Sequence, residues 1–130
     1  MFARILVPLD GSPLAEAILP EVVDLATLHG AEVLLLRVAL VHALPGVDQT
    51  EHTLHGRVER TLRFLPCAKT AVVAGPPFRQ IIRYAREHHV DLIVMGTQGL
   101  SGLDRLIMGS TAERVVRTAP CPVVSIRAAA

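Results

Sequence analysis

The chain has 130 residues, enough for one hydrophobic core but not for two ordinary ones, so we treat residues 1–130 as a single domain. Because 51% of the residues are hydrophobic and only 3% aromatic, aliphatic side chains must fill the interior, which is typical of a sheet covered by helices. With 13 basic and 12 acidic residues, the formal charge of +1 disfavours nucleic acid and anionic membranes as partners.

The hydropathy and the cysteine content of the sequence indicate the cellular compartment. No apolar stretch approaches the roughly 20 residues of a membrane span, and the charged, strand-like beginning does not resemble a signal peptide, so we expect a cytoplasmic protein without a membrane partner. The two cysteines, Cys67 and Cys121, have neither CxxC nor metal-ligand spacing. We interpret both as reduced thiols, with Cys121 buried for a structural reason.

The first predicted element is a strand over Ile5–Leu9, followed by a turn at residues 10–13. Ser12 is a good N-cap and Pro13 suits the first helical position, so a helix is expected to begin there. Pro20 interrupts its apolar stripe and should kink it. Gly30 is expected to end the helix.

A second buried strand is predicted over Val33–Val38, which completes a βαβ unit. Residues 39–50 lack periodicity and are expected to form a loop across the carboxyl edge of the sheet. An amphipathic helix is predicted from Leu54 to Leu65, because its apolar residues recur on one face, its arginines occupy the other and Pro66 ends it.

The alternation continues to the end of the chain. Strands are predicted over Lys69–Ala74, Val90–Met95 and Pro122–Ile126, and helical stripes begin at Phe78 and Ala112. Five strands alternating with four helices indicate a doubly wound, Rossmann-like α/β domain with a parallel sheet of order 3-2-1-4-5. In such a sheet, ligands bind beyond the carboxyl ends of the strands at the switch point.

The connection between the fourth strand and the last helix is rich in glycine. It contains Gly96, Gly99 and Gly109, and Ser110 and Thr111 follow at the predicted start of the helix. Glycine allows main-chain N–H groups to approach a phosphate, and a helix N-terminus attracts an anion. The Walker pattern with its lysine and the G-x-G-x-x-G pattern are both missing. The alternative is an ordinary glycine-rich loop.

Two residues on neighbouring strands add to this site. Asp10 ends the first strand beside the fourth, where its carboxylate would accept hydrogen bonds from ribose hydroxyls. Its alternative role is a turn residue that bonds its own backbone. Val38, at the end of the second strand, would offer apolar surface and backbone groups to adenine, or simply belong to the core.

Over nearly its whole length the chain resembles the universal stress protein family. The resemblance is carried by residues 5–12, 91–97 and 119–123, and by the spacing G-x2-G-x9-G-[ST] from Gly96 to Ser110. It implies an ATP-binding member, with any Mg²⁺ bound through the phosphates, and a homodimer built on the last strand (Val123, Val124, Ser125, Ile126). The candidate nucleotide-binding residues are Pro8, Leu9, Asp10, Val38, Met95, Gly96, Gly99, Gly109, Ser110 and Thr111.

The sequence departs from the family at three places. The segment between the second and third strands is short, Ala112 replaces a hydroxyl found in some nucleotide-binding relatives, and Gln98 replaces a residue that is often basic or histidine. Arg105 is a candidate replacement for that charge, with an exposed arginine as the alternative. No histidine, carboxylate or cysteine grouping completes a metal site, so none is predicted.

These residues favour an adenine-nucleotide-binding regulatory protein of the stress response. No group that would orient a hydrolytic water is identifiable near the glycines, so no catalytic residue is assigned and any hydrolysis of ATP should be slow. A slow ATP hydrolase and a nucleotide-independent dimeric interaction module remain the alternatives.

Overall fold

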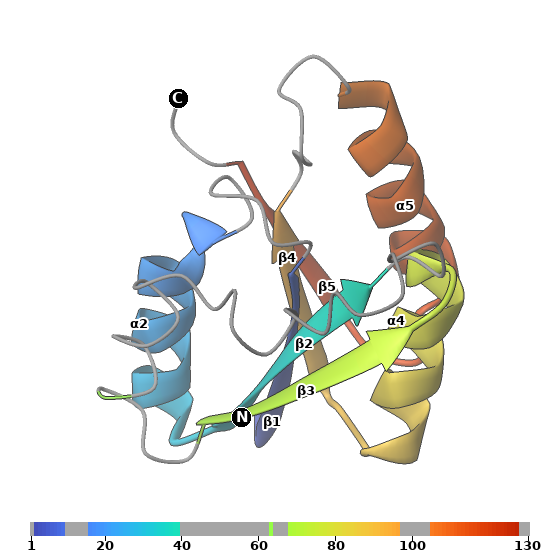
Figure 1. Ribbon diagram of the computed structural model, residues 1–130. Helices are drawn as coiled ribbons and strands as arrows, with labels where there is room; N and C mark the ends of the chain where they lie inside the picture. Colours follow the sequence, from blue (N-terminus) through green and yellow to red (C-terminus); the bar gives the residue numbers. More distant parts are fainter. Residues whose placement is uncertain (1, 10–15, 40–62, 64–67, 97–104, 128–130) are drawn as a thin grey trace.

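The computed structural model describes residues 2–9, 16–39, 63, 68–96 and 105–127. Its five parallel strands form one sheet of order β3-β2-β1-β4-β5, as predicted. Figure 1 shows three layers, with helix α2 on one side of the sheet and helices α4 and α5 on the other. The elements are β1 (Arg4–Leu9), α2 (Leu19–His29), β2 (Glu32–Ala39), β3 (Ala68–Ala74), α4 (Pro77–Glu87), β4 (Leu92–Gly96), α5 (Arg105–Thr118) and β5 (Val123–Ile126).

Side-chain alternation along the central strands divides the interior into two cores. Ile5, Val33 and Val94 belong to the core under α2, whereas Leu6 and Ile93 belong to the core under α4 and α5. All five side chains are almost completely buried. Successive residues of a strand point to opposite faces, so an uninterrupted apolar run serves both cores at once. The predicted parallel sheet with helices on both faces is therefore confirmed.

The helical region after β1 is interrupted near Pro20, as the sequence predicts. Glu16 is helical, residues 17–18 form a turn, and α2 starts at Leu19 with Pro20 in its first turn. Proline has no N–H, and the first turn of a helix is where an N–H has no intrahelical partner, so the interruption lies just before Pro20 and the proline begins a new helix. The expected cap at Ser12 lies outside the described residues.

The end of α2 is as predicted. Gly30 adopts a left-handed conformation (φ 62°), which glycine accepts without the steric strain of a Cβ atom. The N–H of Ala31 donates to the carbonyl of Ala26 at 2.9 Å and so satisfies a carbonyl of the last turn. The chain is thereby directed into β2 one residue later.

Helix α5 begins before the predicted position. The glycine and hydroxyl residues before the apolar stripe led us to expect a start at residues 109–111, but the helix runs from Arg105. Residues 106–108 are leucine, isoleucine and methionine, which are compatible with a helix, and a single glycine weakens a helix by only about 1 kcal/mol. Three helices are therefore described instead of the four predicted, because the predicted helix Leu54–Leu65 falls almost entirely outside the described residues.

Within the described part of the chain, no helix combines the length and the apolar character needed to cross a membrane.

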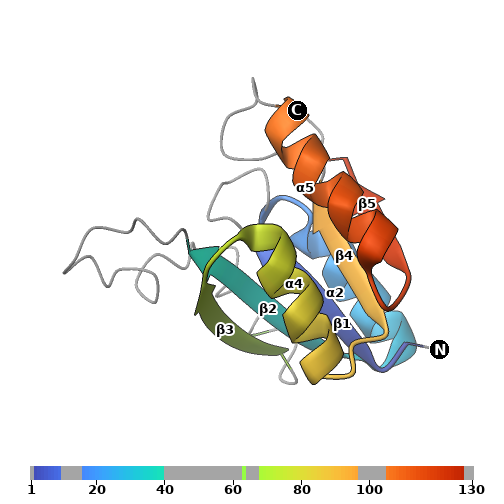
Figure 2. The ribbon, with the colours of Figure 1, turned by 90° about the vertical axis from the view of Figure 1, so that its right-hand side faces the viewer.

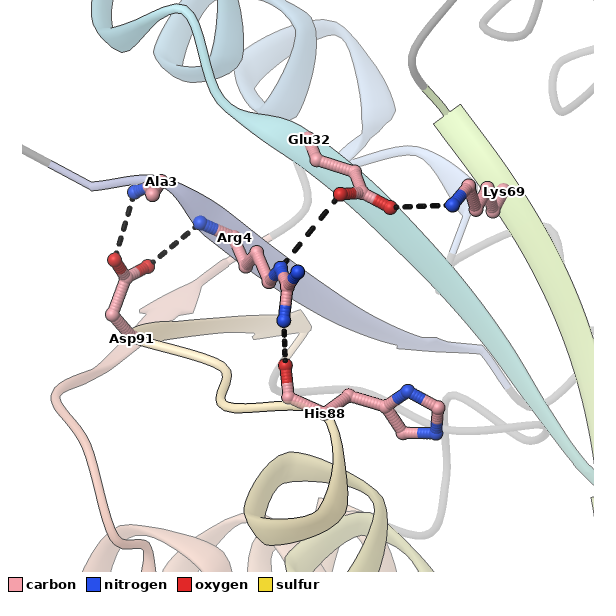
Figure 3. Close-up of polar contacts among 6 residues, drawn as sticks. All are labelled: Ala3, Arg4, Glu32, Lys69, His88 and Asp91. Atoms are coloured by element: carbon pink, nitrogen blue, oxygen red, sulfur yellow. Dashed lines mark hydrogen bonds and ion pairs between the residues drawn. The ribbon is translucent and has the colours of Figure 1, made fainter.

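A polar network joins the amino ends of the strands (Figure 3). The carboxylate of Asp91 accepts the N–H groups of Ala3 and Arg4 at 2.8 and 2.9 Å. The guanidinium of Arg4 donates to the carbonyl of His88 at 2.8 Å and lies 3.7 Å from the carboxylate of Glu32. Glu32 in turn pairs with Lys69 at 3.2 Å. The network thus connects β1, β2 and β3 with the end of α4.

Replacement of Asp91 by alanine is expected to lower the free energy of unfolding by about 1 kcal/mol. The variant leaves two N–H groups without their carboxylate acceptor, and water replaces part of the loss because the site is exposed. Urea denaturation measures the change. Asp24→Ala, at an exposed position of α2, is the matched control and should change stability by less than about 0.5 kcal/mol. Equal effects of the two substitutions would contradict the role given to Asp91.

Candidate functional site

The central feature of the candidate site is the separation of β1 from β4 at their carboxyl ends. The two strands pair only at Ile5 with Leu92 and at Leu6 with Ile93. Both strands continue for three residues beyond this pairing, to Leu9 and Gly96. The adjacent β1–β2 ladder, by contrast, continues to Leu9. The sheet therefore opens between β1 and β4, which is the topological switch point where open α/β sheets bind ligands.

Proline at position 8 explains locally why this opening forms within a central strand. Proline cannot donate a ladder hydrogen bond and is normally confined to sheet edges or to places where pairing ends. The pairing of β1 with β2 includes Pro8 opposite Leu36, whereas the pairing with β4 has ended two residues earlier, at Leu6. On the side that faces β4, β1 is therefore unpaired with β4 after Leu6, as an edge strand would be.

The structure brings four of the predicted nucleotide-binding residues to this opening and a fifth to the same end of the neighbouring strand β2. Pro8 and Leu9 end β1, and Met95 and Gly96 end β4 across the switch point. Val38 lies near the end of β2, on the other side of β1. Val38 and Met95 both belong to the core under α4 and α5, with Val38 8% exposed. The apolar surface predicted for an adenine ring and the predicted phosphate strand therefore lie on the same side of the sheet.

The predicted residues of the last helix occupy a different place from the one expected. Gly109, Ser110 and Thr111 lie inside α5, one turn after its start at Arg105. The N–H groups without an intrahelical acceptor therefore belong to the turn that begins at Arg105. At Gly109 the helix backbone carries no side chain that would keep a ligand away. Ala112 follows as a buried core residue.

Asp10, Gly99 and Gln98 lie outside the described residues. Their predicted contacts with ribose and phosphate consequently stay predictions. The described strands that flank them are β1, which ends at Leu9, and β4, which ends at Gly96.

Arg37 is a polar feature that sequence reasoning missed. It pairs in register with Leu9, which belongs to the core under α2, so its side chain faces away from Val38. Its Nε and Nη1 atoms are buried and have no hydrogen-bond partner among the described residues. Buried N–H groups without an acceptor cost free energy. The signal that could have identified Arg37 from the sequence is that it is the one charged residue within the otherwise apolar run of residues 33–38.

The last strand is an edge of the sheet, as the sequence predicts. β5 pairs only with β4 among the described strands, and Val124 and Ser125 in its middle are exposed. The preceding Cys121 is a free, half-buried thiol that packs against the core under α5. Burial, followed by the nearby Asp91 carboxylate, raises the pKa of Cys121, so its reactive thiolate is disfavoured at neutral pH.

Comparison with known proteins extends these observations. The sequence model described as the Universal stress protein family matches residues 1–127. A universal stress protein of Thermus aquaticus is 34% identical, and the match covers 98% of this chain and all of that protein. The structure of UspA from Lactobacillus plantarum has a TM-score of 0.80 at 31% identity, with 97% of this chain and 98% of that chain covered.

Two more distant structures of similar fold are described with a nucleotide. One is the universal stress protein of Archaeoglobus fulgidus in complex with dAMP, with a TM-score of 0.74 at 21% identity over 96% of this chain and 98% of that one. The other is a family protein of Arabidopsis thaliana with AMP bound, with a TM-score of 0.74 at 20% identity over 98% and 93% of the two chains.

Proposed function

The chain belongs to the universal stress protein family, and on that premise we propose that it binds an adenine nucleotide, ATP, at the opening between β1 and β4. The observation that carries the proposal is the end of the β1–β4 pairing at Leu6 and Ile93, three residues before the strands end. Solved family members that hold dAMP and AMP support the choice of an adenine nucleotide.

The residues around the opening suit the three parts of the ligand. Val38, near the end of β2, would offer apolar surface and backbone groups to adenine. Asp10, the residue after β1, would accept hydrogen bonds from the ribose hydroxyls. The phosphates would follow the glycines, where Gly96 ends β4 without a side chain.

In this proposal main-chain and hydroxyl groups hold the phosphates instead of a lysine. Gly96 and Gly99 allow close approach of the backbone, and the N-terminus of α5 at Arg105 directs N–H groups and positive partial charge toward an anion. Gly109, Ser110 and Thr111 complete the cradle one turn further on. Mg²⁺, if taken up, would be held through the phosphates themselves.

The proposed role is regulation in a cytoplasmic stress response. Nucleotide binding would change the order of the loop after β4 or the dimer surface, and so report the state of the adenine-nucleotide pool to a partner. A binding site without an assigned general base fits retention of the nucleotide better than rapid hydrolysis. Slow hydrolysis of ATP remains the alternative function of the same site.

The test begins with freshly purified protein that is denatured so that any bound nucleotide can be identified by chromatography. The emptied, refolded protein is then titrated calorimetrically with ATP, ADP, AMP and GTP. We expect saturable heat with the adenine nucleotides and a much weaker response to GTP. Absence of both released nucleotide and heat at millimolar ligand would instead indicate the nucleotide-independent module. Sustained phosphate release from ATP would favour the hydrolase.

We also infer that the protein forms a homodimer through β5, as expected from the resemblance. Val124 is 39% exposed on this edge, and an unpaired apolar edge strand favours addition of another strand. Val124→Lys is expected to shift the dimer toward monomer in sedimentation equilibrium, because a lysine would place charge in the interface. Val72→Lys on β3, equally 39% exposed, should leave the dimer intact. A dimer unaffected by the first substitution would exclude this interface.

A further inference from the structure

Helices α4 and α5 stand side by side on one face of the sheet (Figure 2). A groove runs along α4 and reaches the end of α5. Its volume is about 420 Å³, and its lining consists of Phe78, Arg79, Ile82, Arg83, Arg86, Glu87 and Thr118. None of these residues belongs to the proposed nucleotide site. A function of this groove therefore does not depend on nucleotide binding.

Positive charge is concentrated along the α4 side of this groove. Arg79, Arg83 and Arg86 all line it at positions i, i+4 and i+7, so they share one face of the helix and span about 10 Å. The pKa of Arg83 is raised by its hydrogen bond to Glu87, with an Nε to Oε1 distance of 2.8 Å. This i,i+4 pair occupies the one carboxylate of the lining. The other two arginines have no carboxylate within 4 Å among the described residues.

Helix α5 adds a further positive charge at one end of the groove. The guanidinium carbon of Arg114 lies 5.3 Å from the ring centroid of Phe78, in a cation–π contact. This contact leaves the guanidinium N–H groups of the exposed Arg114 available to an acceptor. The whole chain has a formal charge of only +1, so the excess of arginine here is a local property of the surface and not of the composition.

Between the arginines the groove has an apolar floor. Ile82 lies at its base and is 6% exposed, and the half-buried Phe78 ring lies one turn before it. Both side chains also contact the core under α4 and α5, so their positions are fixed by packing. A ligand for this groove must therefore satisfy positive charge and apolar surface together.

We propose that this groove binds an acidic amphipathic segment of a partner protein. An apolar side chain of that segment lies on Phe78 and Ile82, and carboxylates placed on either side of it pair with Arg79 and Arg86. Arginine binds carboxylate in a bidentate geometry, and a groove that combines apolar and charged surface is a recurrent way of binding a helical segment.

A nucleic acid fits the same surface less well. The arginine row is short, since about 10 Å covers only a few phosphates of a duplex strand. An apolar floor has no counterpart in a row of phosphates. An acidic peptide uses both the charge and the floor.

The experiment uses fluorescence anisotropy with a labelled helical peptide that carries glutamates at i, i+4 and i+7 around a central leucine. We expect saturable binding that weakens as salt is added, because exposed charges are screened. The double variant Arg79→Glu/Arg86→Glu should bind about tenfold or more weakly, equivalent to about 1.4 kcal/mol. Both positions are exposed, so circular dichroism should be unchanged.

The matched control is Arg63→Glu/Arg117→Glu, which changes the net charge equally at exposed residues outside the groove. It should retain the affinity of the parent protein. Equal weakening in the control, equal binding of a peptide with lysines in place of the glutamates, or tighter binding of duplex DNA would each overturn the proposal. Absence of saturable peptide binding would do the same, as would self-association that the groove variant abolishes, which would make a second copy the occupant.

Discussion

Valine in place of Gly109 is expected to weaken ATP binding roughly a hundredfold, which corresponds to about 2.7 kcal/mol. Gly109 lies inside α5, one turn after the helix begins at Arg105. In the proposed site the phosphates approach the helix backbone at this residue, and two γ-methyl groups would occupy the same space. Valine has a higher helix propensity than glycine, so the substitution should not weaken the helix itself. Calorimetric titration with ATP measures the change.

Two further variants make this result interpretable. Gly109→Ala adds only a Cβ atom and should have a smaller effect than valine, whereas Glu113→Val on the exposed face of α5 should leave the affinity unchanged. Thermal unfolding of each variant establishes that it is folded. An unchanged affinity in folded Gly109→Val would show that the phosphates do not approach α5 here, and would leave the rest of the proposed site to be tested separately.

Alanine in place of Val94 is expected to lower the free energy of unfolding by about 2.5 kcal/mol, through the transfer free energy of two methyl groups and the cavity that they leave. Val94 is fully buried in the core under α2, and its strand β4 is covered on both faces. At about 4 °C per kcal/mol for a domain of this size, the melting temperature should fall by about 10 °C. Urea and thermal denaturation provide independent measurements.

The control is the same substitution at Val72 of β3. This valine is 39% exposed, so its replacement removes few buried contacts and should change stability by less than about 1 kcal/mol. A comparable loss at both positions would mean that strand propensity, and not burial, determines stability in this sheet.

The sheet could be predicted from the sequence because its strands carry strong local signals. The runs 5–9, 33–36 and 92–95 are apolar without alternation, which is typical of strands covered on both faces. Gly30 and the prolines separate them from the helical stripes. Strand order was harder to infer, because it depends on contacts between distant segments; the handedness of crossovers limited the choices to a few.

Helix starts were predicted less well, and for different reasons at the two helices. Pro20 is compatible either with a kink or with a first turn, and only the packing of Leu19 and Val22 under the sheet decides between them. At α5 the apolar stripe was counted from Ala112, although the helix extends to Arg105. Met108, four residues before Ala112, continues the spacing, but the glycine and hydroxyl residues at 109–111 were interpreted as the helix boundary, and boundaries are the least certain part of such a prediction.

The candidate site, like the fold, could be predicted only in part. The sequence was sufficient to predict that Leu9, Val38 and Gly96 lie at one edge of the sheet, because the parallel strands of a doubly wound fold have their carboxyl ends at the same edge. The early end of the β1–β4 pairing was not predicted, even though Pro8 provides the signal. Arg37 was missed because the surroundings of a charged side chain within a buried strand cannot be inferred until the elements that face it are known.

The β1–β4 pair is fastened at one end and open at the other. At the amino end, Asp91 holds the N–H groups of Ala3 and Arg4, and two register pairs follow immediately. At the carboxyl end, Leu9 and Gly96 are free of that ladder. The neighbouring ladders nevertheless continue to the strand ends, β1 with β2 up to Leu9 and β4 with β5 up to Gly96. A molecule bound at the carboxyl end would therefore meet two strand ends that are held by their outer neighbours and not by each other.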